Sequence, residues 1–396
     1  MRGRRQGRPS RVFVGTAEVA GYAVNLVEGL RSAGVSADRF VLTGDRYSFA
    51  GTNPAAITPS KFPRVCGFVR SIRRFDTFVF LANHSFLWGL DLPILRLAGK
   101  RVVVVYLGID SRPPYLDRAL LRMGPVRLAL RTVGKVAQLR LAEQFATVIV
   151  SNPLSSQLHR RPFVSFGAIG LPYPHDLTRV AKLRVSPPLV VHAPTDPGAK
   201  GTEPIERVLH RLAEEGVISY RRLEGLPNSE FVREIARASL VIDQLYSDTP
   251  AGGVACQSRL AGVPALVFGY GGEAWCHHHP DGTSPPLHHP DHLETVVRDA
   301  VQRLRTEDVP AEEFGWTRNY TDRSLVAQRL LTVLAGEAPA QWWCDPRSIR
   351  YSMGRGMSSR ELSDGLRRYR RRVAPGPLFL RCNPELRTAV EELSKR

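Results

Sequence analysis

Short, mostly apolar runs recur along the chain and alternate with segments whose apolar residues fall on one helical face. The runs are typical of parallel strands that are covered on both sides. They are Arg11–Val14, Phe75–Leu81, Arg101–Leu107, Ala146–Val150, Leu189–Val191, Ile218–Leu223, Leu240–Asp243 and Ala265–Phe268. The helical segments between them include 22–30, 115–140 with a break at Gly124–Pro125, 291–304 and 323–334. This alternation predicts βαβ units and parallel sheets.

The length of 396 residues is more than most single domains contain, so the pattern predicts two α/β domains and a remainder. A stretch rich in Gly and Pro, 166–188, separates the two sets of strands and is typical of a linker. The expected division is a basic arm at 1–10, a first domain at 11–171, a linker at 172–187, a second domain at 188–334 and a basic C-terminal extension at 335–396.

Two loops of the expected second domain have the composition of anion-binding loops. In the first, Gly198 and Gly201 flank Lys200, and Thr202 is placed to cap the following helix. Such a loop lysine is expected to be exposed, so that Lys200→Ala leaves the fold intact. In the second loop, the strand ends at Asp243 and a glycine pair, 252–253, precedes a helix whose first N–H groups favour an anion.

The segments HAPTDPGAKGT, IDQLY and LAGVPALVF resemble, in order and spacing, the C-terminal domain of retaining nucleotide-sugar glycosyltransferases of the family 4 type. The resemblance implies a GT-B fold, in which two doubly wound Rossmann-like domains face a cleft. It further implies a nucleotide-diphosphate sugar as donor substrate, no separate cofactor and no metal. Lys200, Thr202, Asp243, Gly252 and Gly253 match the positions that contact the donor.

The resemblance is looser in the first domain. In YLGIDSRPP, Asp110 matches an Asp-x-Arg pattern of the family, while Leu107 stands where the family commonly has a histidine. His84, in the loop after an earlier strand, is the candidate imidazole, although a lone loop histidine is often only solvated. Gly15 follows the first strand, where the family binds the donor's phosphates, and an ordinary tight turn is the alternative.

The family also commonly has two glutamates across the second glycine loop. Thr249 and Gln257 occupy these positions here, and an amide accepts and donates hydrogen bonds without carrying negative charge. The candidate catalytic residues are therefore Asp110, His84 and Gln257, with Gln257 also contacting the donor. These departures leave open a divergent enzyme or a protein that binds without turnover.

The formal net charge is +18 and the pI is about 10.3, which favours anionic partners. A compositional arginine bias of the genome is the alternative cause. The segment 125–140 places Arg127, Arg131 and Lys135 on one helical face beside apolar residues. It predicts either a helix that lies on an anionic membrane or one that packs on the sheet with solvated arginines. The basic C-terminal extension contains few aromatic residues, so nucleic acid is not favoured as a partner.

No apolar run approaches the roughly 20 residues of a membrane helix, and no secretory segment is evident, so we expect a cytoplasmic protein. Peripheral contact with the inner face of the membrane is an open alternative. The cysteines, Cys66, Cys256, Cys276, Cys344 and Cys382, are expected to be reduced. Six histidines lie between His277 and His292, but their spacing is not that of a metal site.

Three functions fit these observations. The first is glycosyl transfer in polysaccharide biosynthesis, from a nucleotide-diphosphate sugar to a saccharide, lipid-linked or other anionic acceptor, with retention. The second is a non-catalytic GT-B protein that binds a nucleotide sugar or a partner enzyme. The third is a nucleotide-sugar epimerase.

Overall fold

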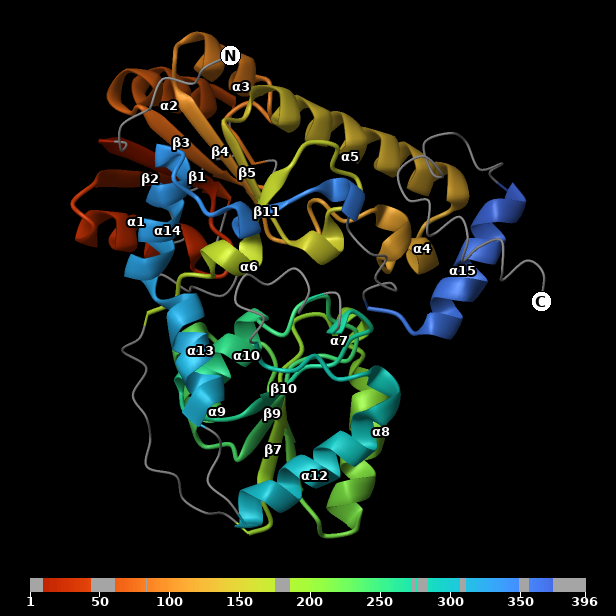
Figure 1. Cartoon of the computed structure of the whole chain (residues 1–396). Coiled ribbons are helices and arrows are strands. Elements are labelled where there is room, and N and C mark those ends of the chain that lie inside the picture. Colours follow the sequence, from red (N-terminus) through yellow and green to blue (C-terminus); the bar gives the residue numbers. More distant parts are fainter. Residues whose placement is uncertain are drawn as a thin grey trace.

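The computed structural model describes residues 10–43, 61–82, 84–174, 186–272, 275, 284–306, 311–348 and 356–372. These residues form two α/β units, each built around a sheet of its own (Figure 1). Residues 1–9 of the expected basic arm, most of the expected linker and residues 276–283 of the histidine-rich loop lie outside the described residues.

The first sheet has seven strands in the order β11-β6-β5-β4-β3-β1-β2. They are β1 (Arg11–Ala17), β2 (Ser36–Thr43), β3 (Thr77–Leu81), β4 (Arg101–Tyr106), β5 (Val148–Ser151), β6 (Phe163–Ser165) and β11 (Trp343–Cys344). The strands are parallel except for β11, which pairs antiparallel with β6. The four strands predicted for this domain are confirmed. The strand order reverses between β1 and β3, which makes that point the topological switch of the sheet.

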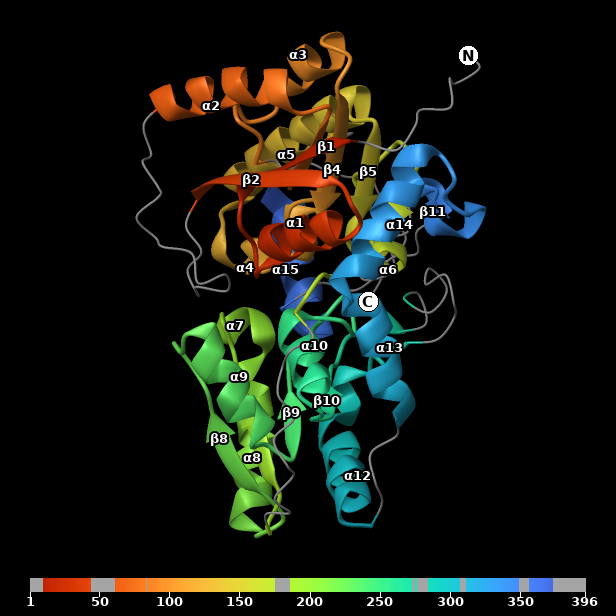
Figure 2. The same ribbon diagram turned by 90° about the vertical axis from the view of Figure 1, so that its left-hand side faces the viewer.

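Helices cover both faces of the first sheet. One face carries α1 (Tyr22–Ser32) and α14 (Arg323–Ala335), and the other carries α2 (Lys61–Arg74), α3 (Asp91–Leu97) and α5 (Pro125–Phe145). Figure 2 shows α2 and α3 on the side of the sheet opposite to α1. The predicted break at Gly124 is confirmed, because α4 (Ala119–Arg122) ends before it and Pro125 opens α5.

The second sheet has four parallel strands in the order β10-β9-β7-β8. They are β7 (Leu189–His192), β8 (Ser219–Arg222), β9 (Leu240–Ile242) and β10 (Ala265–Leu266). The helices of this unit are α8 (Thr202–Glu214), α9 (Asn228–Ala236), α10 (Gly253–Leu260), α12 (Leu293–Thr306) and α13 (Ala311–Thr321). Its switch point lies between β7 and β9. The chain thus contains two doubly wound units, as the sequence predicts.

Short elements connect the main ones. They are η2 (Pro114–Leu116), η3 (Pro153–Ser155), α6 (Phe166–Ile169), α7 (Pro197–Lys200), η4 (Pro290–His292), η5 (Ala340–Trp342) and η6 (Pro346–Ser348). The last described helix, α15 (Ser359–Arg372), packs on α4, and its Leu362 and Leu366 join a small core with Tyr115.

The helix over 323–334 differs from the expectation that it completes the second domain. Side chains of α14 such as Leu330 share a core with α1, and a Cβ on Gly29 would meet the carbonyl oxygen of Arg323 at 2.0 Å. The two helices therefore pack at backbone distance, and β11 adds a strand to the first sheet. An amphipathic pattern shows that one helical face is buried, but not against which sheet. Trp342, at the start of the C-terminal extension, packs on this core.

Candidate functional site

Lys200 and Asp243 meet at the switch point of the second sheet. Lys200 ends α7, and its Nζ donates to Asp243 Oδ1 at 2.5 Å, with the two side chains 12% and 0% exposed. The backbone there is fixed, since Asp196 caps α7 and Leu245 N–H donates to the carbonyl of Lys200. The expectation of an exposed loop lysine is wrong, because the ammonium neutralises a carboxylate buried at the end of β9.

The start of α10 lies against the same carboxylate. A Cβ on Gly252 would meet Asp243 Oδ2 at 2.4 Å, and a Cβ on Gly253 would meet the hydroxyl of Tyr173 at 2.8 Å. Both positions thus require glycine for space. Neither Asp243 Oδ2 nor the Tyr173 hydroxyl has a hydrogen-bond partner among the described residues, and no side chain caps α10. Polar groups without partners therefore converge on an open helix N-terminus.

The sequence predicts that Thr202 caps the helix after the loop, but in the structure Thr202 is the first residue of α8 and does not cap it. The N-cap is Gly201, in the left-handed region with φ 70°, and the Thr202 hydroxyl is turned towards His192. His192 Nδ1 donates to the carbonyl of Ile242 at 2.8 Å, so its Nε2 accepts from Thr202 at 2.9 Å. Burial lowers the pKa of His192 and keeps the ring neutral. Thr202 and His192 thus hold β7 and β9 in place behind the switch point.

The switch point of the first sheet is filled by the chain itself. Gly15 lies within β1 rather than in the following turn, and its Cβ would meet the carbonyl oxygen of Phe40 at 2.4 Å. The Glu18 carboxylate accepts from the N–H groups of Ala23 and Val24 at 3.0 and 3.1 Å. A protein carboxylate therefore occupies the anion position at the N-terminus of α1. The expected turn begins after the end of β1.

Asp110 and His84 come together on the first unit. Burial raises the pKa of Asp110, against the opposing effects of Lys135, His84 and Arg112 nearby. Lys135 Nζ donates to the carbonyls of Ile109 at 2.5 Å and Arg112 at 2.8 Å, and burial lowers its pKa to about 8. The carboxyl group of Asp110, in the loop after β4, thus has an imidazole from the loop after β3 and an amine from α5 nearby.

Gln257 lies on α10 with its side chain turned towards α9. It is buried, and its Nε2 donates to Asn228 Oδ1 at 2.9 Å. The Thr249 hydroxyl accepts from the N–H of Ala251 at 3.1 Å and so shapes the loop before α10. These contacts place Gln257 in the second unit, whereas Asp110 and His84 belong to the first.

Two arginines that the sequence did not single out as contacts join the units. Arg112 forms an ion pair with Asp248, and their side chains are 3% and 6% exposed. Arg118 donates to the carbonyls of Gly198 and Gly356 at 2.5 and 3.3 Å. The carboxyl-end loops of the two sheets therefore face each other and are in contact. Arg112 was visible as part of Asp-x-Arg, but no sequence pattern pairs it with a residue so far along the chain.

Comparison with solved structures finds a similar fold in other proteins. Anabaena HepE, solved with UDP and glucose, is similar over 83% of this chain and 99% of that chain, with a TM-score of 0.51 and 12% identity. An alpha-glucosyltransferase, solved with UDP and a 13-mer DNA containing a HMU base, is similar over 83% of this chain and 100% of that chain, with a TM-score of 0.52 and 10% identity. The chain has the GT-B fold. No protein-family model matches its sequence, and a search of curated proteins finds no significant match.

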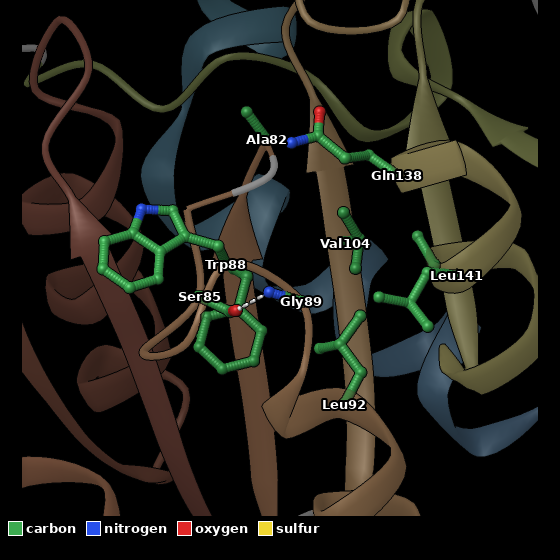
Figure 3. A pocket seen from close by; sticks show the side chains of 10 residues that line it. Ala82, Ser85, Trp88, Gly89, Leu92, Val104, Gln138 and Leu141 are labelled. Carbon is green, nitrogen blue, oxygen red and sulfur yellow. Dashed lines mark hydrogen bonds between the residues drawn. The ribbon is translucent and has the colours of Figure 1, made fainter. Parts of the chain in front are cut away.

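The first unit of this GT-B chain also contains a small apolar pocket between α3 and α5 (Figure 3). Phe80, Leu92, Val104 and Leu141 line it, and the N–H of Gly89 donates to Ser85 Oγ at its edge at 2.6 Å. The pocket lies in the first unit, whereas Lys200 and α10 belong to the second.

The described residues of the GT-B chain contain neither a cluster of metal ligands nor a membrane-spanning helix. Within them, no group of three or more His, Cys, Asp or Glu side chains is arranged to hold a metal ion. Cys66, Cys256 and Cys344 are free thiols, whereas Cys276 and Cys382 are outside the described residues. No described helix combines the length and the apolar character needed to cross a bilayer.

Proposed function

We propose that this chain is a glycosyltransferase that transfers a sugar from a nucleotide-diphosphate sugar to a saccharide, lipid-linked or other acceptor, with retention. The carrying observation is the meeting of Lys200, Asp243 and the start of α10 at the switch point between β7 and β9. Open doubly wound sheets bind ligands outside the carboxyl ends of their strands at such a point. The two structures of the same fold, each solved with UDP, support this assignment.

The diphosphate is assigned to the start of α10. Its first N–H groups attract an anion, and the glycines at 252–253 let the ligand approach the backbone. Lys200 has three N–H donors, of which one goes to Asp243 and the others can reach phosphate oxygens. Protein groups then balance the charge of the leaving group, so transfer needs no divalent metal. Gly15 would contact the donor only if the loop after β1 moved and withdrew the Glu18 carboxylate from the N-terminus of α1.

The acceptor is assigned to the first unit. The raised pKa of Asp110 suits a group that exchanges a proton with an acceptor hydroxyl, and His84 lies on the neighbouring loop. Gln257, whose Nε2 is held by Asn228, offers its amide oxygen to a hydroxyl of the donor sugar. The reaction takes place in the cytoplasm, on intermediates of polysaccharide assembly.

A second candidate is a GT-B protein that binds a nucleotide sugar or a partner enzyme without turnover. The Lys200 charge is already balanced by Asp243, which weakens the attraction for a diphosphate. Leu107 and Gln257 also replace the histidine and glutamate of the resembled family. The third candidate, a nucleotide-sugar epimerase, differs from the first two in its product.

A panel of sugar nucleotides separates these functions. Release of free nucleotide in the presence of a saccharide or lipid acceptor indicates transfer, and conversion of the sugar alone indicates epimerisation. Binding without either product indicates the binding protein. Addition of a chelator should leave transfer unchanged, and its loss with recovery on zinc or manganese would contradict the metal-independent mechanism.

Lys200 variants test the donor site by calorimetric titration with UDP and GDP. Lys200→Ala alone strands the buried Asp243 carboxylate and should destabilise the fold, so the informative variant is Lys200→Ala with Asp243→Asn. The matched control is Asp243→Asn alone, which keeps the ammonium. We expect the double variant to lose about 2–3 kcal/mol of nucleotide affinity relative to this control. Equal affinities would remove Lys200 from the donor site.

A further inference from the structure

Helices α2, α3 and α5, with the loop 84–90 before α3, form a surface that we term the basic helical face. Their inner side chains, such as Phe68, Leu95 and Leu139, share one core under the first sheet. Their outward apolar side chains are exposed: Val65, Val69, Trp88, Leu90, Ile94, Leu97, Val126, Leu130 and Val133. Exposure reaches 89% at Leu97 and 68% at Leu130. So many exposed apolar side chains on one layer of helices indicate an interaction surface.

The charged residues of this face are almost all basic. The segments 61–74 and 125–142 contain no Asp or Glu, and the only acid of 84–100 is Asp91. Asp91 is buried and accepts hydrogen bonds from Ser85 and from the N–H groups of Phe86 and Leu87. The exposed basic residues are Arg70, Arg73, Arg74, Arg96, Arg127 and Arg131. Arg74 pairs with Asp38, and none of the other five forms an ion pair with a described residue. The face is therefore positive and apolar at once.

Trp88 is held outward at the centre of the loop. Its backbone has φ 53°, which a bulky residue rarely adopts, and its side chain is 54% exposed. The guanidinium of Arg64 lies over the indole ring at 4.6 Å, and the loop is fixed by the Ser85 hydroxyl (Figure 3). A rigid tryptophan beside arginine is the side-chain pair favoured at the boundary between lipid headgroups and acyl chains.

The geometry points to docking of the basic helical face on an anionic membrane surface. The apolar side chains enter the headgroup region, and Arg127 and Arg131 bind lipid phosphates. A second copy of this chain is a poorer partner, because a two-fold contact would bring two positive faces together. Nucleic acid matches the charge but offers no apolar surface for Leu97 and Leu130. This docking goes beyond the proposed transfer reaction and does not depend on it.

Co-sedimentation with vesicles tests the docking on the full chain without any nucleotide sugar. The vesicles are phosphatidylcholine alone or phosphatidylcholine with phosphatidylglycerol. The test variant is Arg127→Gln with Arg131→Gln, and the matched control is Arg207→Gln with Arg237→Gln, which removes the same charge from the second unit. Leu97→Gln tests the apolar part, since a side chain so exposed contributes little to folding.

We expect binding to the anionic vesicles and little to phosphatidylcholine. Each arginine near an anionic surface is worth about fivefold in partitioning, so the test pair should weaken binding roughly 25-fold and the control pair less than about threefold. High salt screens the charge contribution to vesicle binding. The loss caused by Leu97→Gln should therefore be largest, relative to wild type, at high salt. No binding to anionic vesicles would overturn the proposal, as would equal losses in both pairs or binding that none of the face variants changes.

Discussion

In the second unit, arginines of α8 and α12 are paired with glutamates of the same or the neighbouring helix, as in Arg207 with Glu203 and Arg211 with Glu294. In the first unit, Arg127 and Arg131 of α5 have no acidic partner among the described residues, and the exposed Val126, Leu130 and Val133 lie on the same helix. Across the described part of 188–306, by contrast, no large apolar side chain is exposed.

The difference bears on the origin of the +18 charge. A compositional bias towards arginine would affect both units alike and would leave each with the same mixture of paired and unpaired charges. The pairing instead differs between the basic helical face and the surface of α8 and α12, and the unpaired charge coincides with exposed apolar side chains. The position of the arginines is therefore more informative than their number. The two surfaces can be compared by removing arginines from each.

The largest expected effect comes from the ion pair that joins the units. Arg112→Ala leaves the buried Asp248 carboxylate without its guanidinium, which should cost about 3–5 kcal/mol in the free energy of unfolding. Arg122→Ala is the control, since its pair with Asp196 is exposed and should change stability by less than about 1 kcal/mol. Urea unfolding measures both, and similar losses in the two variants would contradict the special weight given to burial.

Glu143 gives a smaller effect with a pH signature. Burial alone would raise its pKa, but hydrogen bonds from His159, from the N–H groups of Arg160 and Arg161 and from Arg140 lower it to about 2. A carboxyl group with a lowered pKa stabilises the fold above its ordinary range, near pH 4.5, and loses that contribution as the pH falls towards 2. Glu143→Gln should cost about 2 kcal/mol at pH 7, after allowance for partial exposure.

Unfolding measured from pH 7 to pH 2 tests this assignment. The difference between wild type and Glu143→Gln should narrow as the pH falls below 4.5. If the two free energies of unfolding differed by the same amount at every pH, the packing and hydrogen bonds of Glu143, and not its charge, would be what stabilises the fold.

The paired surface of the second unit should respond weakly. Arg207→Gln removes an exposed pair four residues apart on α8 and should change the free energy of unfolding by less than about 0.5 kcal/mol. Thermal unfolding at low and high salt measures it. A loss above about 1 kcal/mol would mean that these pairs form a cooperative network.

Removal of an unpaired arginine from the first unit should have the smallest effect on stability. Arg127→Gln breaks no ion pair with a described residue, so unfolding should stay within a few tenths of a kcal/mol of wild type. Vesicle binding should nevertheless fall about fivefold. If stability and vesicle binding fell together, the contrast between the two surfaces would be lost.

The sequence predicts much of this fold, because buried parallel strands such as 101–106 are almost purely apolar and because Gly124 and Pro125 mark a helix boundary without ambiguity. It also locates the switch point of the second sheet, since Lys200, Asp243 and Gly252 lie in loops that follow predicted strands. Their roles as ligand contacts stay predictions.

What the sequence could not supply are partnerships between distant residues. Lys200 resembled a free loop lysine because its carboxylate partner is 43 positions away, and Arg112 gave no sign of Asp248, 136 positions away. The helix at 323–335 has an apolar face that fits either sheet, and only the close approach permitted by Gly29 decides for the first. Glu18 was missed because a carboxylate that caps a helix in place of a ligand has no distinctive spacing.

The return of the chain to the first sheet has a consequence for dissecting the protein. Residues 11–171 lack α14, which packs on α1, so a fragment that stops there would expose the part of this core that α14 covers and should aggregate. The first unit is thus discontinuous, with the second inserted into it. Passages 171–173 and 320–322 run side by side, where Tyr173 N–H donates to the Thr321 carbonyl at 2.9 Å. The first unit could therefore be reassembled on its own from a fragment that ends within 171–173 and a separate peptide that contains 322–345.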